Sequence, residues 1–139
     1  MPTLNLSLSP PQSSARHQAL AEALTAITAA TLGKRAEVTA VLIDERPAAQ
    51  WAIGGKAPQH PTAWLEIKVT AGTNSAEQKA AFIAAAFAEL QYQLAPGGQL
   101  EEASYVIVHE LPATDWGYGG QTQRARQVAR ERSAEPHPA

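Results

Sequence analysis

Apolar and polar residues alternate at the start of the chain. Leu4, Leu6 and Leu8 are each separated by one polar residue. This period of two is typical of a strand with one buried face, so residues 3–8 are predicted to form a β-strand. Pro10 then ends it, because proline has no backbone N–H to offer a neighbouring strand.

The spacing of apolar residues changes to a helical one in the next segment. Leu20, Leu24 and Ile27 recur at spacings of four and three, and Gly33 follows the last turn. A glycine in this position commonly ends a helix. The pattern predicts a helix over about residues 14–32.

Residues 38–43 are nearly continuous in apolar residues. Such a run is expected of an interior strand that is covered on both faces. A turn-rich element follows it around residues 51–55.

The same order of elements then returns. Residues 64–69 alternate like the first strand, and residues 105–109 form a second apolar run, which predicts a second interior strand. Between them lies a predicted helix that ends at residues 96–98. The residues expected on its buried stripe are Ile83, Phe87, Leu90 and Leu94.

Two blocks of sequence repeat at one offset of 65 residues, the separation of Trp51 and Trp116. Residues 41–47 correspond to residues 106–112, and residues 51–55 correspond to residues 116–120. Two β-α-β units with right-handed crossovers can merge into one four-stranded sheet with both helices on one face. The predicted fold class is therefore α+β, with short β-hairpins at the unit ends around the Gly-Gly pairs.

The repeat also predicts how the chain divides. Residues 1–121 are expected to form a single domain of two units, about 2–58 and 63–121. Residues 122–139 are rich in Arg, Gln, Glu, Ser and Pro, and are expected to form a C-terminal tail that begins as a helix and ends in disorder. Nothing in the chain covers the second face of the sheet, so partner subunits are expected to bury it.

Composition and charge narrow the classes of function. The chain has 139 residues, a net charge of −2 and no cysteine. Neither nucleic acid nor a membrane is an expected partner, and a soluble, cytoplasmic protein is predicted. No pair of histidines has metal-ligand spacing with an acidic partner, so we expect no metal and no cofactor.

In the order of its motifs the sequence resembles the tautomerase superfamily, in particular a fused, two-unit protein of the 4-oxalocrotonate tautomerase type. Pro2 opens a strand, and a polar turn, an amphipathic helix and a strand ending in Glu45 follow, before the Trp51-Ala-Ile-Gly-Gly segment. The second unit adds Ser75-Ala-Glu-Gln-Lys, which is similar to the family's helix-opening sequence. The resemblance covers about residues 2–121.

The resemblance implies a homotrimer of two-unit chains that acts on a small-molecule substrate. It also implies that Pro2, exposed by removal of Met1, is the catalytic general base of a tautomerase or isomerase that moves a proton in a small enol or keto acid. The role is physically reasonable, because burial and nearby positive charge lower the pKa of an amine and leave it neutral near its working pH. Ala63 stands opposite Pro2 in the second unit, so one such site is expected per chain.

The arginines with which some family members bind dicarboxylates are missing here, which argues against a diacid substrate. The corresponding positions are Gln12 and Thr39 in the first unit, and Thr73 or Asn74 and Tyr105 in the second. Tyr105 is then either a donor to an enolate oxygen or a packing residue.

Four further residues are candidates for substrate binding. Trp51 and Trp116 either line the mouth of the pocket or fill a subunit contact. Arg124 and Arg126 either belong to a solvated helix face or return the missing positive charge. Alternative functions are hydration, dehalogenation or decarboxylation of a small unsaturated acid on the same fold, or a non-catalytic trimer.

Overall fold

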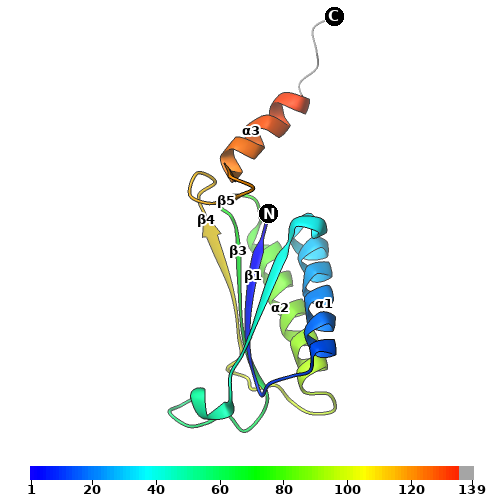
Figure 1. The fold of residues 1–139 in the computed structure, drawn as a ribbon, viewed down its shortest axis with the longest axis vertical. Coiled ribbons are helices and arrows are strands. Elements are labelled where there is room, and N and C mark those ends of the chain that lie inside the picture. The colour runs from blue at the N-terminus through cyan, green and yellow to red at the C-terminus, as the bar shows by residue number, and fades with distance from the viewer. Residues whose placement is uncertain (135–139) are drawn as a thin grey trace, which may run out of the picture.

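The computed structural model describes residues 1–134 and contains one four-stranded sheet with two long helices on one face (Figure 1). The strands of this sheet are β1 (Thr3–Ser9), β2 (Ala40–Glu45), β3 (Thr62–Thr70) and β4 (Tyr105–Leu111). The two long helices are α1 (Ser14–Leu32) and α2 (Ala76–Leu94). The remaining elements are the short helices η1 (Ala36–Val38) and η2 (Ala48–Gln50), the strands β5 (Gly117–Tyr118) and β6 (Gln121–Thr122), and the helix α3 (Gln123–Ala134).

The strand order β2-β1-β3-β4 confirms the predicted duplication. Within each unit the two strands are parallel, β1 with β2 and β3 with β4, and each pair is joined by its helix. The units meet through β1 and β3, which are antiparallel. The result is an α+β fold of two β-α-β units in one mixed sheet.

Local sequence signals set the helix ends. The Ser13 side chain accepts a hydrogen bond from the Arg16 N–H at the start of α1, and Gly33 ends the helix with a φ of 67°. At the start of α2, Ser75 and Gln78 form a reciprocal capping box. Backbone groups that have no partner inside the helix are satisfied in this way.

The core lies between the sheet and the two helices. Leu4, Leu6 and Leu8 of β1 are fully buried, and so are Leu65 and Ile67 of β3. Leu20 and Leu24 of α1, and Phe82, Ala86 and Leu90 of α2, complete this core. The alternation read from the sequence therefore marks the face of each central strand that the helices cover.

The prediction that residues 38–43 and 105–109 form interior strands is wrong within one chain. β2 and β4 are the edge strands, because the antiparallel join of the two units places their first strands in the centre. β2 begins only at Ala40, since η1 occupies the residues before it. The helices shield only the side of β2 that carries Val41 and Ile43, while Leu42 on the other side is exposed.

The predicted stripe of α2 is displaced by one residue in its first part, where Phe82 and Ala86 are buried in place of Ile83 and Phe87. Phe82 is fully buried, whereas Ile83 is 40% exposed and points away from the core. Phe87 packs only partly against the core, while Leu90 and Leu94 are buried as expected.

The second face of the sheet is open in the single chain, as the sequence predicts. Leu42 is 54% exposed and Tyr105 is 53% exposed on this face. The Trp64 ring packs against the Tyr105 ring with centroids 5.2 Å apart. Apolar side chains of this size thus line a surface that no element of the described chain covers.

The Gly-Gly pairs form tight turns at the ends of both units. Gly119 and Gly120 have φ values of 60° and 79° and connect β5 to β6. Gly54 and Gly55, with φ values of 61° and 80°, connect the bridged residues Ile53 and Lys56. Two consecutive residues with positive φ are typical of the tight turns that favour glycine, and the predicted hairpins are confirmed.

The C-terminal segment forms the helix α3, which extends from the end of the sheet where β1 begins (Figure 1). The disorder predicted for the very end of the chain falls on residues 135–139, which lie outside the described residues. Among residues 1–134, no helix combines the length and apolar character needed to cross a membrane.

The register of α2 can be tested by paired substitutions. We expect Phe82→Ala to lower the free energy of unfolding by about 3–5 kcal/mol, because it opens a cavity in the core. Ile83→Ala should cost less than about 1 kcal/mol, because the side chain is largely solvated. Guanidinium unfolding at equal protein concentration measures both, and equal losses would contradict this register.

Candidate active site

The N-terminus lies at the end of a central strand, enclosed by elements from both ends of the chain. β1 begins between β2 and β3, and the N-terminus and the start of α3 lie at the same end of the sheet (Figure 1). Pro2 is buried and Met1 is half-buried. The Ala40 N–H donates to the Pro2 carbonyl at 3.4 Å, which continues the pairing of β1 with β2.

A basic hollow of about 230 Å³ adjoins the N-terminus. Three cations contribute to its lining, Lys34 and Arg35 from the segment after α1, and Arg130 from α3. The other lining residues are Met1, Gly33, Thr70, Thr73, Gln123 and Gln127. Among residues 1–134 no acidic side chain lines this hollow, which makes it suited to an anion.

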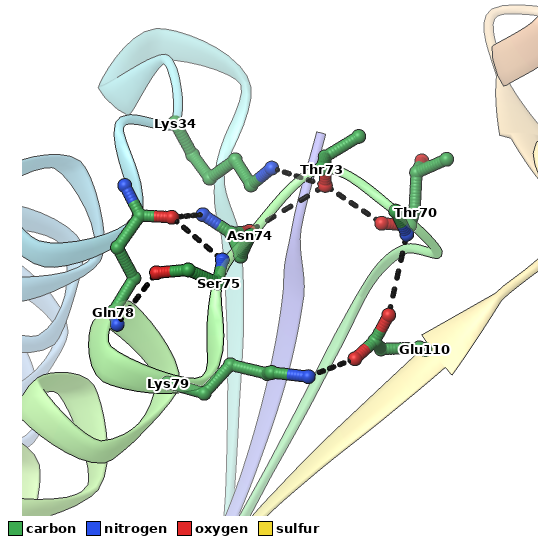
Figure 2. A network of polar contacts seen from close by, with 9 residues as sticks. Lys34, Thr70, Thr73, Asn74, Ser75, Gln78, Lys79 and Glu110 are labelled. Carbon is green, nitrogen blue, oxygen red and sulfur yellow. Dashed lines mark hydrogen bonds and ion pairs between the residues drawn. The ribbon is translucent and has the colours of Figure 1, made fainter.

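A hydrogen-bond network holds Lys34 at this hollow (Figure 2). The Lys34 ammonium donates to the Thr73 hydroxyl at 2.9 Å, and that hydroxyl lies 2.6 Å from the Thr70 carbonyl. The Asn74 side chain donates to the carbonyl of Leu32 at the end of α1. The loop between β3 and α2 is thereby tied to the segment that carries Lys34.

The same loop is fixed on its other side by Glu110 of β4 (Figure 2). Glu110 accepts from the Lys79 ammonium and from the Gly72 N–H. Both contacts lower the pKa of the Glu110 carboxyl, with Lys79 the larger cause. The loop is thus held by polar contacts to α1, α2 and β4.

The electrostatics of the site disfavour a protonated N-terminus. The pKa of the Met1 amine is lowered from 8.0 to about 6, mainly by burial and then by the positive charges of Lys34, Arg130 and Arg35. Burial also lowers the pKa of the Lys34 ammonium. An amine in this position is therefore largely neutral at pH 7 and can accept a proton.

An apolar hollow of about 290 Å³ lies on the other side of the N-terminus. Its walls come from the start of β1, from Val38 and Ala40, and from Trp116, Gly117 and Tyr118 at the β5 hairpin. Met1 and Gln123 line both this hollow and the basic one. The N-terminal residue thus borders both a positively charged space and an apolar space.

The single chain brings some of the sequence-predicted candidates together and separates others. Trp116 lines the apolar hollow beside Pro2. Tyr105 pairs with Trp64, which pairs with Ser7, and at about 3.3 Å per residue Ser7 lies on the order of 16 Å along β1 from Pro2. Trp51 lines a different hollow, of about 350 Å³, together with Ser7 and Trp64.

Arg124 and Arg126 lie close to the site without lining either hollow. The Arg124 N–H donates to the Ala113 carbonyl, and its side chain is exposed. The Arg126 guanidinium donates to the Tyr118 carbonyl at 3.0 Å and lies 3.8 Å from the centre of the Tyr118 ring. Arg126 therefore holds a wall of the apolar hollow in place.

The cations that line the basic hollow were not among the sequence candidates. Lys34 and Arg35 directly follow Gly33, the glycine that ends α1. This basic pair lies between α1 and β2, and β2 is parallel to β1. Because parallel neighbours begin at the same end of a sheet, the pair lies at the end where β1 begins. The order of elements could therefore have placed Lys34 and Arg35 near the N-terminus from the sequence alone. The position of Arg130 could not be predicted in this way, because it depends on the direction of α3.

The position in the second unit that corresponds to Pro2 has no free amine. Ala63 is fully buried in β3, and its backbone N–H donates to the Ser104 hydroxyl at 3.1 Å. In the part of the chain that the structure describes, no group of three or more His, Asp or Glu side chains is arranged to hold a metal ion.

Comparison with known proteins agrees with the fold. The family described as "Tautomerase enzyme" matches residues 2–60. A solved structure of native fused 4-OT is 32% identical, with a TM-score of 0.75, and the match covers 88% of this chain and 97% of that chain. The chain belongs to the tautomerase superfamily.

Two further solved structures show the same architecture. One, a wild-type fused 4-OT asymmetric trimer, is 29% identical with a TM-score of 0.78, and covers 90% of this chain and 98% of that one. A second, a wild-type fused 4-OT symmetric trimer, is 24% identical with a TM-score of 0.76, and covers 89% and 98%. A search of curated proteins found no match.

The cationic surroundings of the N-terminus predict the sign of a pKa change. In the chain that retains Met1, Lys34→Met should raise the pKa of the Met1 amine above about 6, because one charge that repels the ammonium is lost. The rate of N-terminal acylation as a function of pH measures this pKa. Arg132→Gln is the control, since Arg132 is exposed and does not line the hollow, and an equal shift in both variants would contradict the assignment.

Proposed function

We propose that this protein is a tautomerase that uses the amine of Pro2, exposed by removal of Met1, as the general base on a small enol or keto acid. The observation that carries the proposal is a half-buried N-terminal amine with a lowered pKa, beside three cations. The Pro2 nitrogen is one residue further along the chain, and we expect burial and the same charges to lower the pKa of its amine as well. Membership of the tautomerase superfamily supports this reading.

The reaction needs one group that accepts and returns a proton. The neutral Pro2 amine takes the proton from the hydroxyl of an enol, and the resulting ammonium donates a proton to the carbon that becomes saturated. Negative charge develops on the enolate oxygen and on the carboxylate of the substrate. The surrounding cations stabilise this charge and at the same time keep the resting amine neutral.

We also propose that the active form is a homotrimer with one Pro2 site per chain. The related fused 4-OT structures include trimers. The open face of the sheet, with Leu42 and Tyr105 more than half exposed, supports a subunit contact there. In such a trimer Trp51 and Tyr105 would meet residues of a neighbouring chain, and their roles are part of this proposal.

The decisive experiment compares the mature wild type with Pro2→Ala. The proposal requires an intact mass that lacks Met1. We expect Pro2→Ala to slow the ketonisation of phenylenolpyruvate or 2-hydroxymuconate by about 10²–10⁴-fold, the usual contribution of a general base. Equal rates, or a retained Met1, would rule out the proline base, and no rate above the uncatalysed reaction in either protein would indicate a non-catalytic homologue.

The pH dependence of kcat/KM gives a second test. The rate should rise with pH as the Pro2 ammonium loses its proton, and the midpoint should lie below the ordinary range of an N-terminal amine. Lys34→Met should move this midpoint to higher pH, whereas Arg132→Gln should leave it unchanged.

A further inference from the structure

Met1 lines both of the hollows beside the N-terminus. It lines the basic hollow with Lys34 and Arg130, and it lines the apolar hollow with Val38 and Trp116. Removal of Met1 would therefore do more than expose an amine. It would take away a residue that lines both hollows and leave the Pro2 nitrogen beside the space that Met1 occupied.

Gln123 is the residue most affected by the removal of Met1. It is only 3% exposed, and its side-chain amide donates to the Met1 carbonyl at 3.5 Å. In the chain that begins at Pro2 this acceptor is gone, and a buried donor without a partner is unfavourable. The vacated space thus offers a hydrogen bond to an oxygen atom beside the Pro2 amine.

Helix α3 presents three residues to the site from one face. Gln123, Gln127 and Arg130 are four and three residues apart, the spacing of neighbours on one side of a helix. The start of the helix is anchored, because the Gln123 N–H donates to the Trp116 carbonyl at 2.9 Å. The helix is therefore fixed at the point where Gln123 meets the N-terminus.

Two of the cations in the basic hollow have no acidic partner. Arg35 forms an ion pair with Glu37 at 2.9 Å. Within residues 1–134, neither Lys34 nor Arg130 forms an ion pair. Their charges are available to a carboxylate in the hollow that they line.

We propose that α3 is a substrate-binding helix of this tautomerase, in which Gln123 donates to the carbonyl or enolate oxygen of the substrate and Arg130, together with Lys34, binds its carboxylate. The inference rests on the proposed function and adds the substrate class. The preferred substrate is a 2-keto or 2-enol acid with a single carboxylate and an apolar tail. The tail lies in the apolar hollow, against Val38 and Trp116.

The apolar hollow argues against a second carboxylate at the far end of the substrate. In the part of the chain that the structure describes, no charged side chain lines it. A carboxylate placed there would lose water without gaining a cation as partner. We therefore expect kcat/KM for phenylenolpyruvate to exceed that for 2-hydroxymuconate.

The role of Arg130 is tested against a matched neighbour on the same helix. Arg130→Gln should raise KM for phenylenolpyruvate by about tenfold to a hundredfold, because a hydrogen bond to a charged group is lost. It should change kcat by less than about threefold. Both arginines are exposed, but Arg132 does not line the hollow, so Arg132→Gln removes the same charge from outside it. It should leave both constants at wild-type values.

The role of Gln123 is tested by removing the donor while keeping the shape of the side chain. Gln123→Glu should lower kcat by about tenfold to a thousandfold, because an ionised carboxylate cannot donate to the enolate oxygen. Gln123→Leu should have the same effect. Circular dichroism and the oligomeric mass of both variants show whether α3 and the assembly are intact. Because the two substitutions differ in polarity, the same loss of kcat in both folded variants points to the missing donor rather than to a folding defect.

The outcomes separate this inference from the proposed function. If Pro2→Ala keeps the full rate, the proposed function is overturned and this inference with it. If Pro2→Ala is inactive while Arg130→Gln behaves like Arg132→Gln and Gln123→Glu keeps the wild-type kcat, only the role of α3 is overturned. A preference for 2-hydroxymuconate over phenylenolpyruvate would overturn the proposed substrate class.

Discussion

The antiparallel pairing of β1 with β3 is the constraint on which the rest of the structure depends. It joins the two β-α-β units and brings Leu4, Leu6 and Leu8 beside Leu65 and Ile67, on the face that both helices cover. Because β1 is central, its first residue emerges between two neighbouring strands rather than at an exposed edge. The chain terminus is thereby placed where the segment after α1 and the start of α3 also arrive. A group at this position is enclosed by residues that are far apart in the sequence.

The enclosure has an electrostatic consequence. Lys34, Arg35 and Arg130 lie near one another and near an amine, so protonation of that amine adds a fourth positive charge to a partly buried space. Like charges in such surroundings are unfavourable, and the amine relieves the repulsion most readily by staying neutral. Hydrogen bonds from Lys34 to Thr73 and from Asn74 to the end of α1 keep the cluster together in spite of this repulsion. The site is thus organised for a negatively charged occupant before one binds.

Much of the fold could be predicted from the sequence, because alternation, helix-capping residues and the 65-residue repeat each carry a local physical signal. The sequence did not predict that β2 and β4 lie at the edges of the sheet. The number of apolar residues in a strand does not determine which strand of one unit pairs with which strand of the other. Ile83 and Phe82 are adjacent and both apolar, and only the packing of α2 decides which of them is buried. Two residues of the candidate site could be identified from the sequence. Pro2 precedes the first strand, and Trp116 belongs to the repeated segment that ends in Gly-Gly. Arg130 and Gln123 had none, because their place depends on where α3 begins and in which direction it runs.

The position of Met1 has a practical consequence for anyone who handles this protein. Its amine faces a space bounded by Lys34 and Arg130, and its carbonyl contacts Gln123. Any peptide joined to this nitrogen, such as a purification tag, must pass through that space and occupy it. A fusion at this end would therefore give a folded protein that blocks its own cavity. The far end of α3 extends away from the sheet (Figure 1), which makes it the better place for an attached label.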